Sequence, residues 1–185
     1  MNPWKTLSSR EVYRNPWIRL REDQVIRPDG QPGIYGVIEA KKASGVLVVD
    51  NDGLIVLVGQ YRYTMECYSW ELIAGGTEPD ETPLVAAQRE LREEAGLIAH
   101  DWRPLGHELH LSNCFSSERA YLFLARDLTA TESSPEGTEV LQIRRVSFAE
   151  AQAMVLSGAI QDAMTVIGLL LYGCSQELDE LQRHP

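Results

Sequence analysis

The sequence predicts an α/β fold in which a mixed β-sheet is sandwiched between helices. Segments with the short apolar pattern of strands outnumber those with helical periodicity, and the helical segments interrupt and follow the strands. A doubly wound parallel sheet fits less well, because it alternates strands and helices throughout. The first 42 residues look like strands alone. We therefore expect an N-terminal antiparallel β extension over residues 1–42 and an α/β domain over residues 43–185.

The composition is that of a packed globular protein. The chain has 185 residues, of which 44% are hydrophobic and 24% charged. Its net charge of −10 repels polyanions, so duplex nucleic acid is not an expected partner. The apolar runs are too short to cross a bilayer, and the N-terminus lacks the apolar segment of a signal peptide. We expect a cytoplasmic protein that does not bind membranes.

Two hairpins are predicted within the first 62 residues. Each pairs two apolar segments across a turn rich in Gly, Asp, Asn or Pro, which are the residues that turns favour. A further short strand, 69–75, runs into a pair of glycines. The hairpin strands are 17–27 and 33–40, joined by the turn 28–33, and 45–50 and 54–62, joined by Asn51-Asp52-Gly53.

The spacing of apolar residues predicts a helix over residues 83–95. Thr82 can cap its first turn, and Pro83 suits the first helical position. Gly96 is a good stop signal. One face is apolar, at spacings of three and four residues, and comprises Leu84, Ala87, Leu91 and Ala95.

The C-terminal half is predicted to add strands and two more helices. Ser147 and Glu150 have the spacing of a capping box, which starts a helix ending near Gly158. Asp162 can cap a last helix that runs to about Leu181. The expected strands are 102–111, 120–127 and 139–146, with a polar loop over 129–138.

Helix 83–95 gathers acidic residues on one side. Glu90, Glu93 and Glu94 lie three or four residues apart, and each like-charged pair costs about 0.2–0.5 kcal/mol. Bound Mg²⁺ or Mn²⁺ reverses this repulsion, because hard divalent cations prefer oxygen ligands. Arg89 can hold a carboxylate from the side. The alternative is an acidic face that is merely solvated. The preceding Gly75-Gly76, where a backbone can turn sharply toward a ligand, favours the metal site.

The stretch from residue 75 to residue 97 resembles the Nudix box, G-x5-E-x7-R-E-U-x-E-E-x-G-U, where U is aliphatic. The resemblance is specific, because every fixed position of the pattern is matched without a gap. It implies an α/β/α sandwich and Mg²⁺-dependent hydrolysis of a nucleoside diphosphate linked to another group. The matching residues are Gly75, Glu81, Arg89, Glu90, Leu91, Glu93, Glu94, Gly96 and Leu97.

The same resemblance implies roles for individual residues. Glu90 and Glu94 would be the main ligands of Mg²⁺, which Mn²⁺ could replace. Glu93 would bind a metal directly or through water, and the carbonyl of Ala74 would complete the shell. Arg89 would orient the glutamates, and Glu81 would support them.

Upstream residues resemble the branch that hydrolyses ADP-ribose and nucleoside diphosphate sugars. Residues 58–76 carry the Q-[YF]-R and W-E-[LI]-x-A-G patterns of that branch. The resemblance implies a small nucleotide substrate whose phosphate or ribose contacts Arg62, and a homodimer formed through the N-terminal extension. Trp17 and Tyr35 are candidates to stack on the base, or else to make core or dimer contacts.

Two downstream segments bear on the substrate and on the catalytic base. Residues 112–118 resemble the S-P-G-F-S-x-E segment of ADP-ribose hydrolases, but Asn113 replaces proline and Cys114 replaces glycine. These departures favour nucleoside diphosphate sugars, with ADP-ribose as the alternative substrate. In this branch the catalytic base comes from a later loop, which here offers Glu139 first and Glu136 second, to deprotonate water or to bind a further metal. The alternative is that both are solvated acids of the loop.

Two further hypotheses remain. One is a non-catalytic Nudix module that only binds a nucleotide or a protein, but such members usually lose carboxylates of the box. The other is a hydrolase of nucleoside triphosphates, which the N-terminal extension and the segment WELIAGG disfavour.

Overall fold

The computed structural model describes residues 1–133 and 140–183, with side chains up to residue 177. It divides into two compact units. The first comprises Met1–Lys42 with Leu109–Arg119, and the second comprises Ala43–Glu108 with Ala120–Pro185. The first unit includes the predicted extension, residues 1–42, and adds residues 109–119 to it.

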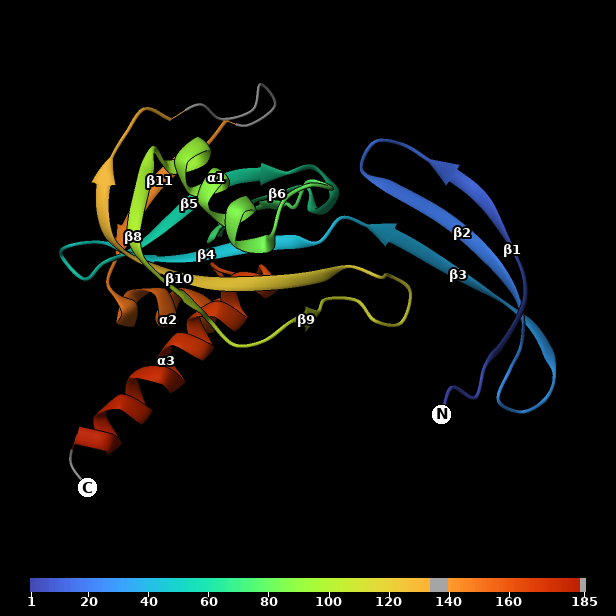
Figure 1. Cartoon of the computed structure of the whole chain (residues 1–185). Coiled ribbons are helices and arrows are strands. Elements are labelled where there is room, and N and C mark those ends of the chain that lie inside the picture. The colour runs from blue at the N-terminus through green and yellow to red at the C-terminus, as the bar shows by residue number, and fades with distance from the viewer. Residues whose placement is uncertain (134–139, 184–185) are drawn as a thin grey trace. The chain divides into compact units, whose positions relative to one another are not determined.

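The first unit is built on a three-stranded antiparallel sheet. Its strands are β1 (Lys5–Arg14), β2 (Ile18–Ile26) and β3 (Pro32–Ala40), in that order across the sheet, drawn in blue in Figure 1. The β2–β3 hairpin confirms the prediction, and its turn places Gly30 at a φ of 81°. Strand β1 was not predicted, since its sequence, KTLSSREVYR, is mostly polar and is exposed along its whole length.

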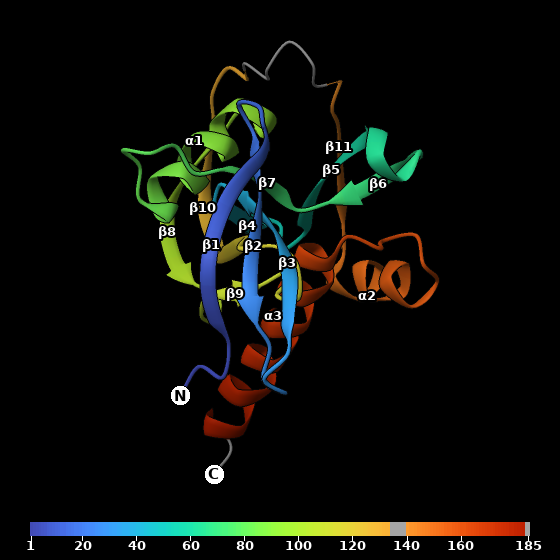
Figure 2. The same ribbon diagram turned by 90° about the vertical axis from the view of Figure 1, so that its right-hand side faces the viewer.

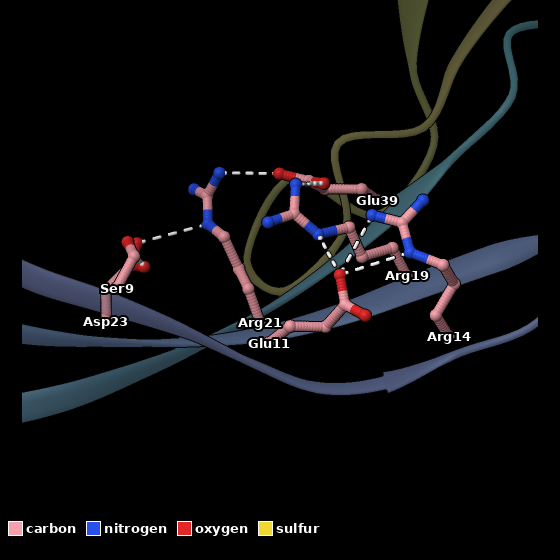
Figure 3. Close-up of polar contacts among 7 residues, drawn as sticks. All are labelled: Ser9, Glu11, Arg14, Arg19, Arg21, Asp23 and Glu39. Atoms are coloured by element: carbon pink, nitrogen blue, oxygen red, sulfur yellow. Dashed lines mark hydrogen bonds and ion pairs between the residues drawn. The ribbon is translucent and has the colours of Figure 1, made fainter.

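Ion pairs connect the three strands of this sheet (Figure 3). Arg19 donates to Glu11 of β1 and to Glu39 of β3, both at 2.9 Å, and Arg21 donates to Glu39 at 2.6 Å. A hydrogen bond from Arg14, together with the nearby charges, lowers the pKa of Glu11. Buried Asp23 accepts a hydrogen bond from Ser9. The sheet is therefore held by cross-strand charge pairs as well as by its backbone ladder.

The segment Leu109–Arg119 is fastened to β3 within the first unit. The amide of Ile38 donates to the carbonyl of Phe115 at 2.8 Å, and the amide of Ser117 donates to the carbonyl of Ile38 at 2.9 Å. The hydroxyl of Tyr35 donates to the carbonyl of Cys114 at 2.6 Å. These bonds join residues nearly 80 positions apart in the sequence.

The second unit contains a mixed sheet with the strand order β11-β5-β4-β10-β8. Strand β10 runs parallel to β4 and antiparallel to β8, and β4 pairs antiparallel with β5. The predicted mixed sheet is thus confirmed. The strands are β4 (Ala43–Val49), β5 (Ile55–Arg62), β6 (Cys67–Glu71), β7 (Ile73–Gly76), β8 (Leu97–Pro104), β10 (Arg119–Ala130) and β11 (Gln142–Val146), with a 3-10 turn at Tyr63–Met65. The short strand β9 (Leu109–His110) belongs to the residues of the first unit.

Helices cover both faces of this sheet, as Figures 1 and 2 show. Helix α1 (Pro83–Ala95) lies on one face, and α2 (Phe148–Leu156) and α3 (Ala163–Arg183) lie on the other. The core beneath α1 joins its apolar face to strand residues that are fully buried. Its members include Ala87, Leu91, Val46, Val48, Val56, Val58 and Ile73. The α/β/α sandwich is confirmed.

The three predicted helices and their caps are confirmed. Thr82 accepts a hydrogen bond from the amide of Val85 at 3.3 Å, and Ser147 accepts one from Glu150 at 3.1 Å. Asp162 accepts one from Thr165 at 2.8 Å. None of the helices in the described part of the chain has the length and apolar character needed to span a membrane.

Three strand predictions need correction. The strand predicted at 69–75 is two strands. Strands β4 and β5 pair with each other only next to the turn that joins them, so β6 pairs with β5 and β7 pairs with β4. The strand predicted at 102–111 was wrong in its bounds, since β8 begins at Leu97, directly after the helix cap, and ends at Pro104. Strand β10 runs on to Ala130, three residues beyond the predicted end at residue 127.

Candidate active site

Strand β7, the following loop and helix α1 place the acidic residues. Thr82 and Pro83 start the helix, and Gly96 ends it in the left-handed conformation, at a φ of 62°. Because the helix packs its apolar side on the sheet, the adjacent side faces the end of β7. Glu90 and Glu94 are one turn apart on that side, and both are buried.

Arg89 makes hydrogen bonds to three of the carboxylates. Its guanidinium donates to both oxygens of Glu81, at 2.8 and 3.1 Å, to Glu90 at 2.7 Å and to Glu93 at 3.0 Å. It also donates to the carbonyl of Gly76 at 2.9 Å, which ties the helix to the preceding loop. The hydrogen bond to Glu81, followed by those to Glu90 and Glu93, raises the pKa of Arg89 against the opposing effect of its burial.

Gly75 lies directly against the carboxylate of Glu90. A Cβ at position 75 would fall 1.9 Å from Oε1 of Glu90 and 2.2 Å from its Cδ. No side chain fits there unless the glutamate moves. The first glycine of the motif therefore makes room for a buried carboxylate.

Three carboxylates, those of Glu81, Glu90 and Glu93, share the guanidinium of Arg89, and Glu94 lies one turn from Glu90, so negative charge is left in excess. Hard oxygen ligands on one helix face, with the glutamate in a cradle that only glycine leaves open, fit a divalent cation. Among the side chains of residues 1–133 and 140–177, no group of three or more His, Cys, Asp or Glu is arranged to hold a metal ion.

Arg62 is held by the buried carboxylate of Glu71, which was not among the predicted site residues. The two side chains form a two-point pair across β5 and β6, with Nε of Arg62 2.8 Å from Oε1 of Glu71. The hydrogen bond to Glu71 is the largest cause that raises the pKa of Arg62, and the charges of Asp162 and Glu94 add to it. Arg62 thus lies within the electrostatic reach of the acidic helix.

Helix α3 is tied to the strand that leads into the site. The amide of Leu72 donates to the hydroxyl of Thr165 at 2.9 Å, and that hydroxyl donates to Asp162 at 2.7 Å. Leu72 lies where β6 ends and β7 begins. These hydrogen bonds fix Leu72, the residue between β6 and β7. Thr165 is completely buried.

The other predicted site residues belong to the first unit or fall outside the described residues. Trp17 is 72% exposed, and the half-buried Tyr35 packs edge to face against Trp4, with ring centroids 5.3 Å apart. Both belong to the first unit. Glu136 and Glu139, the candidates for the catalytic base, lie outside the described residues. Glu71 could have been found from the sequence as a single acid in an otherwise apolar and aromatic strand, YSWELIAG, because a buried carboxylate needs a cation.

Comparison of the sequence with known protein families identifies the family of this chain. The sequence profile described as the NUDIX domain matches residues 40–164, and the one described as the nucleoside diphosphate sugar hydrolase N-terminal domain matches residues 4–38. The chain belongs to the Nudix family. The predictions of a Nudix fold and of a pyrophosphohydrolase are confirmed, and Nudix hydrolases use divalent cations.

Individual relatives extend over most of the chain. A protein of Mycobacterium tuberculosis named ADP-ribose pyrophosphatase is 34% identical over 171 residues, covering 90% of this chain and 82% of its own. A protein of Bacillus subtilis with the same name is 29% identical over 167 residues, covering 89% of this chain and 90% of its own. The crystal structure of an ADP compounds hydrolase superposes with a TM-score of 0.84 at 22% identity and covers 95% of both chains. That structure supports the fold.

Proposed function

We propose that this Nudix hydrolase cleaves the pyrophosphate bond of nucleoside diphosphate sugars, giving a nucleoside monophosphate and a sugar phosphate. The observation that carries the proposal is the buried, Arg89-braced carboxylate cluster beside Gly75. It is supported by the match of residues 4–38 to an N-terminal domain described for nucleoside diphosphate sugar hydrolases.

ADP-ribose is the second candidate substrate. The names of the relatives from M. tuberculosis and B. subtilis favour it. Asn113 and Cys114, which replace the proline and glycine of the ADP-ribose segment, favour other sugars. ADP-ribose is itself a nucleoside diphosphate linked to a sugar, so both candidates require the same bond cleavage.

Mg²⁺ is the proposed cofactor, with Mn²⁺ as a substitute. The carboxylates of Glu90 and Glu94 and the carbonyl of Ala74 would hold it, with Glu93 as a direct or water-mediated ligand. When bound, the cation neutralises charge on the diphosphate and makes water easier to deprotonate. A diphosphate would otherwise be repelled by a chain of net charge −10.

The remaining roles belong to the chain's own side chains. Arg89 keeps the glutamates in place through its four hydrogen-bonded partners. Arg62 would contact phosphate or ribose, because a guanidinium binds phosphate oxygens with two parallel hydrogen bonds. Glu139, with Glu136 second, would take the proton of the attacking water. Trp17 and Tyr35 would contact the base.

We also propose that the chain forms a homodimer through residues 1–42 and works in the cytoplasm. The dimer proposal is supported by the long exposed strand β1, which is an edge strand among the described residues, and by the exposed apolar side chains of the first unit.

A substrate panel with Mg²⁺ tests the function. ADP-ribose, ADP-glucose, UDP-glucose, GDP-mannose, a dinucleoside polyphosphate and a nucleoside triphosphate would be assayed for released monophosphate. We expect the fastest release from a nucleotide sugar, abolished by Glu94→Gln and retained by Glu177→Gln on the exposed part of α3. Preference for the triphosphate would refute the substrate class, and no hydrolysis of any compound would leave the non-catalytic module.

A further inference from the structure

The second unit contains an open pocket of about 540 Å³ beside Arg62. We propose that this pocket binds the sugar of the nucleoside diphosphate sugar, which makes it the site where the chain selects the group attached to the diphosphate. The inference depends on the proposed function. The pocket lies between the β5–β6 turn and the loop that leads into α3, and the wall residues used below are Arg62, Tyr68, Glu71, Ala159, Gln161 and Asp162.

The pocket is linked to the acidic helix through the strands that carry its wall. Arg62 and Glu71 line the pocket, and Glu71 ends β6 two residues before β7, the strand on which α1 packs. Glu71 occupies one edge of the guanidinium, through Nε and Nη2. Among the described residues, Nη1 of Arg62 has no protein acceptor. The outer edge of Arg62 can therefore bind a phosphate or a sugar oxygen at the pocket entrance.

The charges of the wall favour an uncharged polar group over a second anion. Glu71 and Asp162 both line the pocket, and the positive charge of Arg62 is already matched by Glu71. A terminal phosphate within the pocket would face two carboxylates and one guanidinium. Sugar hydroxyls, in contrast, donate hydrogen bonds to carboxylates at no such cost.

The acceptors in the wall are fixed in place. Oδ2 of Asp162 is bound by the amide and the hydroxyl of Thr165, at 2.8 and 2.7 Å, and the structure records no donor for its other oxygen among the described residues. Gln161, next to it, adds an amide. Because Asp162 is already held, a sugar hydroxyl can bind it without ordering it first.

One aromatic side chain completes the wall. Tyr68 packs edge to face against Trp70, with centroids 5.6 Å apart, and the guanidinium of Arg144 lies 5.6 Å from the ring of Trp70. The two rings lie over Gly59, where a Cβ would fall 2.4 Å from the hydroxyl of Tyr68. A held aromatic ring among polar groups suits a small polar ligand, and the pocket volume is within the range of small-molecule sites of about 300–1,000 Å³.

The test narrows the pocket at Ala159, an exposed lining residue in the loop before α3. Ala159→Trp is compared with Ala153→Trp, an exposed alanine on α2 that does not line the pocket. Each is assayed on the best nucleoside diphosphate hexose and on the methyl ester of the same nucleoside diphosphate. We expect Ala159→Trp to raise KM for the hexose compound by about tenfold or more, because the indole would fill the space of the sugar and weaken its binding in the ground state and the transition state alike. KM for the methyl ester should rise less than about twofold.

A second measurement does not depend on turnover. Binding of the free hexose 1-phosphate is followed by ligand-observed NMR, with thermal melts to confirm that both variants fold. We expect weaker binding in Ala159→Trp alone. Equal KM changes for both compounds, or unchanged binding of the sugar phosphate, would overturn the pocket assignment while leaving the hydrolase. If wild type cleaved neither compound, the proposed function and the pocket assignment would fall together.

Discussion

The Cα of Gly75 lies against the carboxylate of Glu90, so closely that a methyl group on Gly75 would fall 1.9 Å from Oε1 of the glutamate. Strand β7 and helix α1, which carry these residues, can approach this closely because Gly75 has no side chain. The same carboxylate oxygen accepts a hydrogen bond from Arg89 at 2.7 Å. A change at residue 75 must therefore disturb both the glutamate and the arginine.

Gly75→Ala tests this contact. The methyl group would push Glu90 off Arg89, so we expect hydrolysis to fall on the order of 100-fold, as a displacement of about 1 Å can cause. Stability should fall by about 1–3 kcal/mol, which is typical of overpacking. Activity assays and urea unfolding measure the two effects. Gly36→Ala on β3 is the control, because nothing lies within 4 Å of its Cβ position, and an active Gly75→Ala variant would contradict the argument.

Arg89→Lys tests whether a single guanidinium is required. An ammonium cannot reproduce hydrogen bonds to Glu81, Glu90 and Glu93 at once, although it keeps the charge. We expect kcat to fall by about 100-fold, with a loss of about 1–2 kcal/mol in stability. Arg92→Lys, on the exposed side of the same helix, should change neither. If Arg89→Lys kept wild-type kcat, charge alone would suffice.

The stability difference between wild type and Glu118→Gln should depend on pH. Burial raises the pKa of the Glu118 carboxyl above the ordinary value of 4.5, so charging it costs more in the folded chain than in the unfolded one. This cost is absent below pH 4.5 and grows as the pH rises through the raised pKa. Glu118→Gln should therefore be more stable than wild type at pH 7.5, and the advantage should vanish at pH 4. Urea titrations at both values measure it. An equal difference at the two values would contradict the prediction.

The dimer proposal predicts a response to charges on β1. Leu7 and Val12 are 55% and 47% exposed on this edge strand. The double variant Leu7→Glu/Val12→Glu should raise the dimer dissociation constant by about tenfold or more, because buried charges weaken an apolar interface. Sedimentation equilibrium gives the constants. Ile98→Glu, at an exposed position of the second unit, should leave it unchanged, and a monomeric wild type would remove the proposal.

The local patterns of the sequence predicted much of the fold. Helix α1 has the predicted bounds, and the caps at Thr82, Ser147 and Asp162 are in place, because capping and apolar periodicity act within a few residues. Strand β1 could not be predicted in this way. Its polar residues are held by pairing with β2 and by charges on neighbouring strands, which are set by contacts rather than by local preference.

The candidate site divides along the same line. The Nudix box named the cluster around Arg89 because its residues are close in the sequence and make hydrogen bonds within one helix and its preceding loop. The pairing of Arg62 with Glu71 depends on the register of β5 and β6. The position of Asp162 in the pocket beside Arg62 depends on the packing of α3. Neither follows from a one-dimensional pattern.

Mn²⁺ binding followed by electron paramagnetic resonance tests the central claim most directly. The wild-type chain, Glu94→Gln and the control Glu177→Gln would be titrated with Mn²⁺ in the presence of a non-hydrolysable nucleoside diphosphate sugar. We predict binding by wild type and by Glu177→Gln, and an affinity about 10- to 100-fold lower in Glu94→Gln. Absence of bound Mn²⁺ in wild type, or the same affinity in all three proteins, would contradict the account.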